Sequence, residues 1–144
     1  MAFHFITNDN WRNNMLSTEV FYLVLTTGLT GVIWIFYIGN RLLELGTTAT
    51  LNNPAVGHEP KAKWAQRLIR AHQNAIENLV IFAILVVVIE LSQLNNEITA
   101  LATLIYFYTR LAHVIIYTLG IPVARTLAFI GGFACQALLF IQVI

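Results

Sequence analysis

Polar and ionisable side chains interrupt two apolar stretches of this sequence with helical spacing. They are Arg70, Asn74 and Glu77 in the first stretch, and Arg110, His113 and Tyr117 in the second. Residues three and four apart lie on one face of an α-helix. Guanidinium, amide, imidazole and phenol groups together offer more hydrogen-bond donors than acceptors. The spacing therefore predicts two helix faces suited to a polar, anionic ligand.

The two faces match in height if the helices are antiparallel neighbours joined by a short turn. In that register Glu77 lies level with Arg110, Asn74 with His113, and Arg70 with Tyr117. Ionisable groups inside a bilayer are costly and tend to pair or to mark a functional site. We therefore expect an ion pair between Glu77 and Arg110, either as a structural clasp or as the floor of a ligand cleft.

Arg125 lies where a further helix is expected to begin. A fixed positive charge and the backbone N–H groups at a helix start favour an anion, and they lower the pKa of a nearby thiol. Arg125 can thus stabilise a thiolate, or it can serve only to anchor the helix at the membrane interface. The single cysteine, Cys135, excludes an internal disulfide and is expected to be a small buried residue. No spacing typical of a metal site occurs among these residues.

Four apolar segments are long enough to position these side chains across a membrane, which takes about twenty residues each. We predict helices over 20–40, 62–94, 98–119 and 122–144. A polar segment over 46–63 predicts a surface loop, and Asn95, Asn96 and Glu97 predict a short turn. Gly120, Ile121 and Pro122 predict a helix break, and Gly131 and Gly132 predict close helix packing. The chain divides into a polar N-terminal segment, 1–16, and a four-helix domain, 17–144.

Composition agrees with an all-α, integral membrane fold. The chain is 58% hydrophobic and only 10% charged, whereas a soluble domain has about 25% charged residues. The bilayer is therefore an expected partner of the fold. A net charge of +1 gives no support for nucleic-acid binding.

Basic residues predict the orientation, because short cytoplasmic loops carry an excess of them. Those near the first and third connections are Arg41, Lys61, Lys63, Arg67 and Arg125, whereas Glu90 and Glu97 flank the second. We expect the loops between helices one and two and between helices three and four to be cytoplasmic. The membrane is a bacterial inner membrane or the endoplasmic reticulum, depending on the source.

These residues resemble the membrane-associated proteins in eicosanoid and glutathione metabolism, the MAPEG family. The helix-two signature of its microsomal glutathione transferase branch is similar to Arg67, Arg70, Ala71, His72, Asn74, Glu77 and Asn78. The third and fourth helices of the family are similar to Arg110, His113 and Tyr117, followed by Arg125, Leu127, Phe129 and Gly132. The resemblance covers residues 17–144. Gln73 stands where some eicosanoid-processing members have arginine, which argues against an eicosanoid specialist.

The resemblance implies a homotrimer that binds glutathione between neighbouring subunits on the cytoplasmic side. The residues that would bind glutathione are Arg41, Arg70, Asn74, Glu77, Arg110, His113 and Tyr117. Arg125 would be the catalytic residue, because it would stabilise the glutathione thiolate.

The leading hypothesis is therefore a membrane-bound glutathione transferase or peroxidase that acts on lipophilic electrophiles. One alternative is a non-catalytic MAPEG-like protein that binds lipid or serves as an accessory subunit of a larger membrane complex. Another is a membrane-structural protein whose polar residues only fix the helix register. The sequence does not name the second substrate, because the outer faces of helices one and four are uniformly apolar.

Overall fold

The computed structural model describes residues 16–53 and 59–144. Over these ranges the chain forms four α-helices and no strand: α1 (Thr18–Leu51), α2 (Lys63–Leu91), α3 (Glu97–Leu119) and α4 (Pro122–Val143). All four are long and apolar enough to cross a membrane. The expected all-α fold with four candidate membrane spans is confirmed. The predicted N-terminal segment, 1–16, lies outside the described residues except for Leu16.

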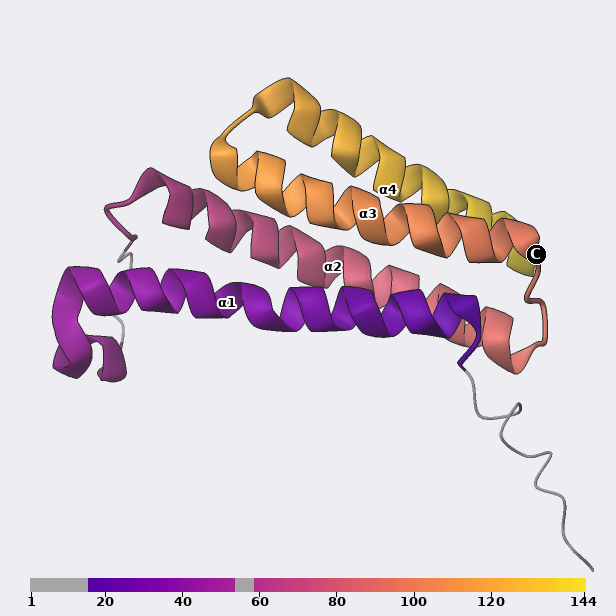
Figure 1. Ribbon diagram of the computed structural model, residues 1–144, viewed down its shortest axis with the longest axis horizontal. Coiled ribbons are helices and arrows are strands. Elements are labelled where there is room, and N and C mark those ends of the chain that lie inside the picture. Colours follow the sequence, from indigo (N-terminus) through magenta and orange to yellow (C-terminus); the bar gives the residue numbers. More distant parts are fainter. Residues whose placement is uncertain (1–15, 54–58) are drawn as a thin grey trace, which may run out of the picture.

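The helices run up and down beside one another (Figure 1). One end of the bundle holds the α1–α2 and α3–α4 connections and the residues Arg41, Lys61, Lys63, Arg67, Arg70 and Arg125. We call it the basic end. The other end holds the start of α1, the α2–α3 connection and the end of α4, with Glu19, Glu90 and Glu97. We call it the acidic end.

The first helix is longer than its apolar run predicts. It continues past Asn40 to Leu51, with a kink at Gly46, where φ is 76°. The prediction of a loop from residue 46 is therefore wrong for residues 46–51. After the kink the chain forms one more helical turn, in which the Thr50 hydroxyl donates to the Gly46 carbonyl. Local hydrogen bonds thus sustain a helical turn in a segment too polar to indicate one.

Side-chain and backbone caps set the other helix ends. Asn96 forms a capping box with Thr99 at the start of α3, and Gly120 ends α3 with φ of 81°. Pro122 is the first residue of α4, where its missing N–H costs nothing. At the start of α2 the Glu44 carboxylate of α1 accepts from the backbone N–H groups of Lys61 and Ala62. These caps fix where α2, α3 and α4 begin.

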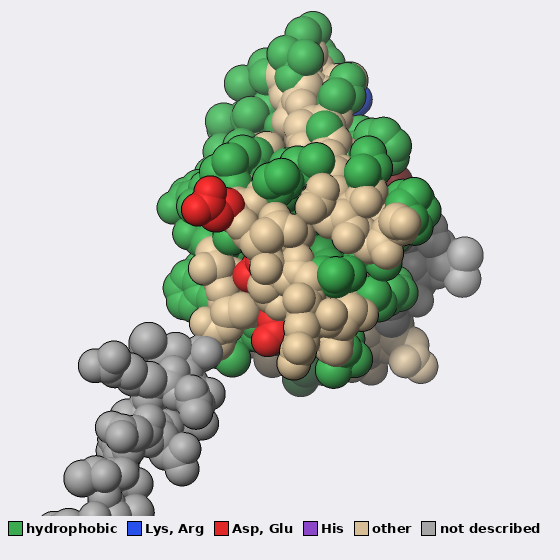
Figure 2. Space-filling model, turned by 90° about the vertical axis from the view of Figure 1, so that its right-hand side faces the viewer, with side chains coloured by type: hydrophobic (Ala, Val, Ile, Leu, Met, Phe, Trp, Pro, Cys, Tyr) green, Lys and Arg blue, Asp and Glu red, His purple; other side chains and the backbone are tan. Residues whose placement is uncertain are grey.

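The main hydrophobic core lies among α2, α3 and α4. The Phe82 and Tyr106 rings stack with centroids 3.9 Å apart, and Leu139 packs in the same cluster. Cys135 is buried in this cluster, as expected. Outside the core, large apolar side chains are exposed on all four helices. Figure 2, which looks at the acidic end, shows them around the sides, with carboxylates on the end face. This distribution suits a bundle surrounded by lipid.

Candidate functional site

Arg110 is a buried cation between α2, α3 and α4. Its side chain is only 2% exposed. Nη2 donates to the Phe129 carbonyl at 3.1 Å, and Nη1 donates to Asn74 Oδ1 at 3.5 Å. Nε has no hydrogen-bond partner. A buried guanidinium held mainly by dipoles is a charge without an opposite charge beside it, which is energetically costly.

A glycine lets α4 approach this guanidinium closely. A Cβ atom at Gly132 would lie 1.9 Å from Nη2 of Arg110, so no other residue fits without displacing the arginine. The predicted close packing at Gly132 is confirmed by this contact. The guanidinium also lies against the rings of Tyr106 and Phe129, with Cζ 5.3 and 5.6 Å from their centroids. Aromatic faces attract cations and so stabilise the charge in place.

Toward the basic end the polar contacts continue through α3 to α4. The His113 and Tyr117 rings pack in a T-shaped arrangement, with centroids 5.5 Å apart. The guanidinium of Arg125 lies over the Tyr117 ring, with Cζ 4.5 Å from its centroid. His113 also lies 6.2 Å from the Phe129 ring. We call Asn74, Arg110, His113, Tyr117 and Arg125 the polar seam.

The expected ion pair between Glu77 and Arg110 does not form. The one ion pair among the described residues joins Arg70 to Glu59, at 3.9 Å. The buried face of α2 carries Ala71, Ala75, Asn78 and Phe82, whereas Glu77 lies exposed on a different face. Arg110 therefore meets Asn74, about one helical turn from the predicted register. Arg70, Asn74 and Glu77 do share one face of α2, but Arg70 and Glu77 on that face are exposed.

Two further predicted site residues lie apart from the polar seam. Arg70 is exposed and pairs with Glu59, and among the described residues it makes no hydrogen bond to Tyr117. The α2 residue that reaches α3 at this height is Arg67, which donates to the Thr118 carbonyl at 2.9 Å. Arg41 lines a small cavity of about 100 Å³ between α1 and α2, where its buried Nε has no partner. Neither Arg70 nor Arg41 contacts the polar seam in the described part of the chain.

A comparison with protein families identifies the fold. The sequence model of the MAPEG family matches residues 20–144, which span all four helices. The chain belongs to the MAPEG family. No curated protein and no solved structure gives a significant match. Four apolar helices in a MAPEG chain are the architecture of a multi-pass membrane protein.

Beside the polar seam, this MAPEG chain has a groove between α2 and α4 with a volume of about 540 Å³. Asn74 and Glu77 line its polar part, whereas Ile81, Phe133 and Phe140 line its apolar part. Such a groove can hold a polar group near Asn74 and a hydrocarbon group farther along the helices. Glu77 thus lines this groove and forms no ion pair with Arg110.

Sequence reasoning missed a buried glutamine in this MAPEG fold. The Gln136 side chain is 4% exposed and donates from Nε2 to the Asn78 carbonyl at 2.8 Å and to the Tyr106 hydroxyl at 3.2 Å. It links α4 to both α2 and α3, and the Tyr106 side chain that it contacts also lies against Arg110. A lone amide within the apolar run of α4 was the signal, because polar side chains inside membrane helices usually bond to neighbouring helices.

A second missed contact joins α1 to α2. The Tyr37 hydroxyl and His72 Nδ1 lie 3.1 Å apart. His72 appears in the helix-two signature, but the sequence does not indicate a partner on α1. The contact fixes α1 against the helix that carries Asn74 and Glu77.

Proposed function

We propose that this protein is a glutathione-dependent transferase or peroxidase of the microsomal glutathione transferase branch, acting on lipophilic electrophiles. The observation that carries the proposal is the polar seam, in which Arg110 and Arg125 have no carboxylate within ion-pair distance among the described residues. Leaving the buried Arg110 cation without a carboxylate in an apolar bundle is costly, and Arg125 adds a second unpaired cation at the basic end. An anionic ligand of the same length as the seam would offset that cost.

The groups present fit a tripeptide with two carboxylates and one ammonium. Arg110, Asn74, His113 and Tyr117 supply donors for carboxylate and amide oxygens, and the free Glu77 carboxylate suits the ammonium. Bound glutathione would supply the sulfur nucleophile.

Arg125 has the catalytic role in this proposal. It lies in the first turn of α4, where backbone N–H groups and the helix dipole add to its positive charge. The Tyr117 ring holds its guanidinium on the side that faces the seam. A cation fixed in this way favours the thiolate over the thiol and so raises the fraction of reactive nucleophile.

We further propose that the active unit is a homotrimer. Glu77 lies at the middle of the 29-residue α2 and is exposed on the side of the subunit. A carboxylate exposed to acyl chains at that depth is unfavourable, so a second copy of the chain is the natural cover. Arg70 and Arg41, which lie away from the seam of their own subunit, would reach the ligand of a neighbour. The basic end would face the cytoplasm.

The test is conjugation of glutathione to 1-chloro-2,4-dinitrobenzene by the purified protein. Replacing Arg125 by Ala should lower kcat/KM by about 100-fold, the usual effect of removing one charge-stabilising donor. Arg125→Lys is the matched control and should retain part of the activity, because it keeps the charge. Equal rates for wild type and Arg125→Ala would remove Arg125 from the mechanism. An inactive wild type that also fails to bind glutathione would favour the accessory-subunit alternative.

A further inference from the structure

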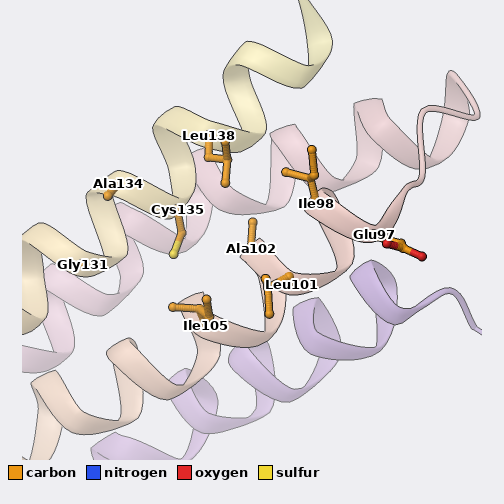
Figure 3. A pocket seen from close by; sticks show the side chains of 9 residues that line it. All are labelled: Glu97, Ile98, Leu101, Ala102, Ile105, Gly131, Ala134, Cys135 and Leu138. Carbon is orange, nitrogen blue, oxygen red and sulfur yellow. The ribbon is translucent and has the colours of Figure 1, made fainter.

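A second groove lies between α3 and α4 toward the acidic end (Figure 3). Its volume is about 450 Å³, within the range of small-molecule sites. Figure 3 shows Glu97 at one end of the groove and Gly131 at the other, with the Cys135 sulfur pointing between the two helices. Small side chains, among them Ala102 and Ala134, leave the space open.

The walls of this groove are apolar and open to the side of the bundle. Leu101 is 56% exposed and Ile105 is 41% exposed, and both line the groove. From Glu97 to Ile105 the helix rises roughly 12 Å. In a membrane this groove would start at the interface and extend into the hydrocarbon region. Its shape suits one extended hydrocarbon chain.

The charge at the mouth of the groove selects the headgroup. Glu97 is exposed in the first turn of α3, and no hydrogen bond or ion pair engages its carboxylate in the described part of the chain. Glu19 and Glu90 lie at the same end, whereas the lysines and arginines of the described ranges lie at the basic end or in the seam. The charged side chains described at this end are therefore carboxylates, which repel anionic headgroups.

We propose that the α3–α4 groove binds a single-chain amphiphile with a protonated amine. The hydrocarbon chain lies between Leu101 and Ala134, and the ammonium pairs with Glu97 at the membrane interface. The binding is non-covalent and lies toward the opposite end from Arg125. This site is therefore independent of the proposed glutathione chemistry, and either proposal can fail alone.

The experiment measures binding of radiolabelled dodecylamine to the full-length protein in phosphatidylcholine nanodiscs, by scintillation proximity. Unlabelled dodecanol and dodecanoate compete as chain-matched neutral and anionic probes. We expect dodecylamine to displace the label best, dodecanol less well and dodecanoate least. Equal displacement by dodecanoate would overturn the proposal.

Two variants test the two parts of the site separately. Ala134→Leu fills the groove and should abolish the specific signal. Glu97→Gln keeps the groove open but should weaken dodecylamine binding by about fivefold, the upper range for an exposed ion pair. The matched control is Glu90→Gln, which removes the same charge at the same end but does not line the groove. Its effect should stay below about twofold, because Glu90 does not line the groove and solvent and salt screen its charge.

Unchanged binding by Ala134→Leu would show that the label lies in bulk lipid and would overturn the proposal. Unchanged binding by Glu97→Gln, or an equal loss in Glu90→Gln, would overturn the assigned ion pair. Circular dichroism of each variant confirms that the helices remain folded, and Glu97→Gln replaces an exposed side chain, so its fold is not at risk.

Discussion

Polar side chains gather both at the acidic end and in the polar seam, and the two groups are bonded in different ways. At the acidic end Glu19, only 2% exposed, accepts from the Thr99 hydroxyl, which also belongs to the capping box of Asn96. Asn96 in turn donates to Gln142 of α4 at 3.1 Å. The Glu90 carboxylate accepts from Ser17. These contacts tie the four helices together.

The polar seam makes fewer bonds of its own. Arg110 has one long contact to Asn74, one bond to a carbonyl and an Nε without a partner. The guanidinium of Arg125 makes a cation–π contact with the Tyr117 ring. Polar groups that satisfy one another stabilise a fold, whereas donors left free are available to a ligand. The contrast shows that side-chain hydrogen bonds link the helices at the acidic end, and it supports the proposal that the seam binds a ligand.

The largest stability effect should come from Glu19→Ala. The variant loses a charged hydrogen bond and leaves the Thr99 hydroxyl without its α1 partner, which costs about 2 kcal/mol. The melting temperature in detergent should fall, while the affinity for glutathione stays the same. Thr99→Val keeps the shape of the side chain and removes the same hydrogen bond by deleting its donor instead of its acceptor. A weaker affinity for glutathione in Glu19→Ala would contradict the assignment of separate roles to the acidic end and the polar seam.

A smaller loss is expected from Asn96→Ala. This change removes the capping box of α3 and the bond to Gln142, with a cost of about 1 kcal/mol. The measurement is again the melting temperature. Asn95→Ala is the matched control, because Asn95 makes one exposed hydrogen bond, to Glu90 Oε2, and takes no part in the capping box. If Asn95→Ala costs as much as Asn96→Ala, the cap is not what stabilises this end.

The smallest stability effect should come from Arg110→Met, although it alters a buried charge. Replacing a buried, poorly paired charge by an apolar side chain of similar length is often neutral or stabilising. The melting temperature without ligand should therefore stay level or rise. A fall as large as that of Glu19→Ala would mean that Arg110 is a structural clasp.

The sequence predicted the helices well because each apolar run is long and its breaks are marked by turn residues. Gly120 and Pro122 occur where α3 ends and α4 begins, as expected. The end of α1 was missed because residues 46–51 are polar, and helix continuation there depends on local bonds such as that of Thr50. A hydropathy pattern does not record such bonds.

The polar seam was predicted in its membership on α3 and α4 but not in its pairing. Spacing alone shows that Arg110, His113 and Tyr117 share a face, and all three lie in the seam. The pairing with α2 depends on the rotation of that helix about its axis, which small residues such as Ala71 and Ala75 determine by packing inward. Glu77 and Asn74 lie on the same face of α2, so the sequence spacing alone did not show which of them contacts Arg110.

The central claim is that the polar seam binds an anionic ligand and does not merely fix the helix register. The most direct test is the rise in melting temperature caused by 10 mM glutathione in wild type and in Arg110→Met, since a ligand that binds only the folded state stabilises it. The account predicts a clear rise for wild type and none for Arg110→Met. No rise in wild type, or an equal rise in both proteins, would contradict it.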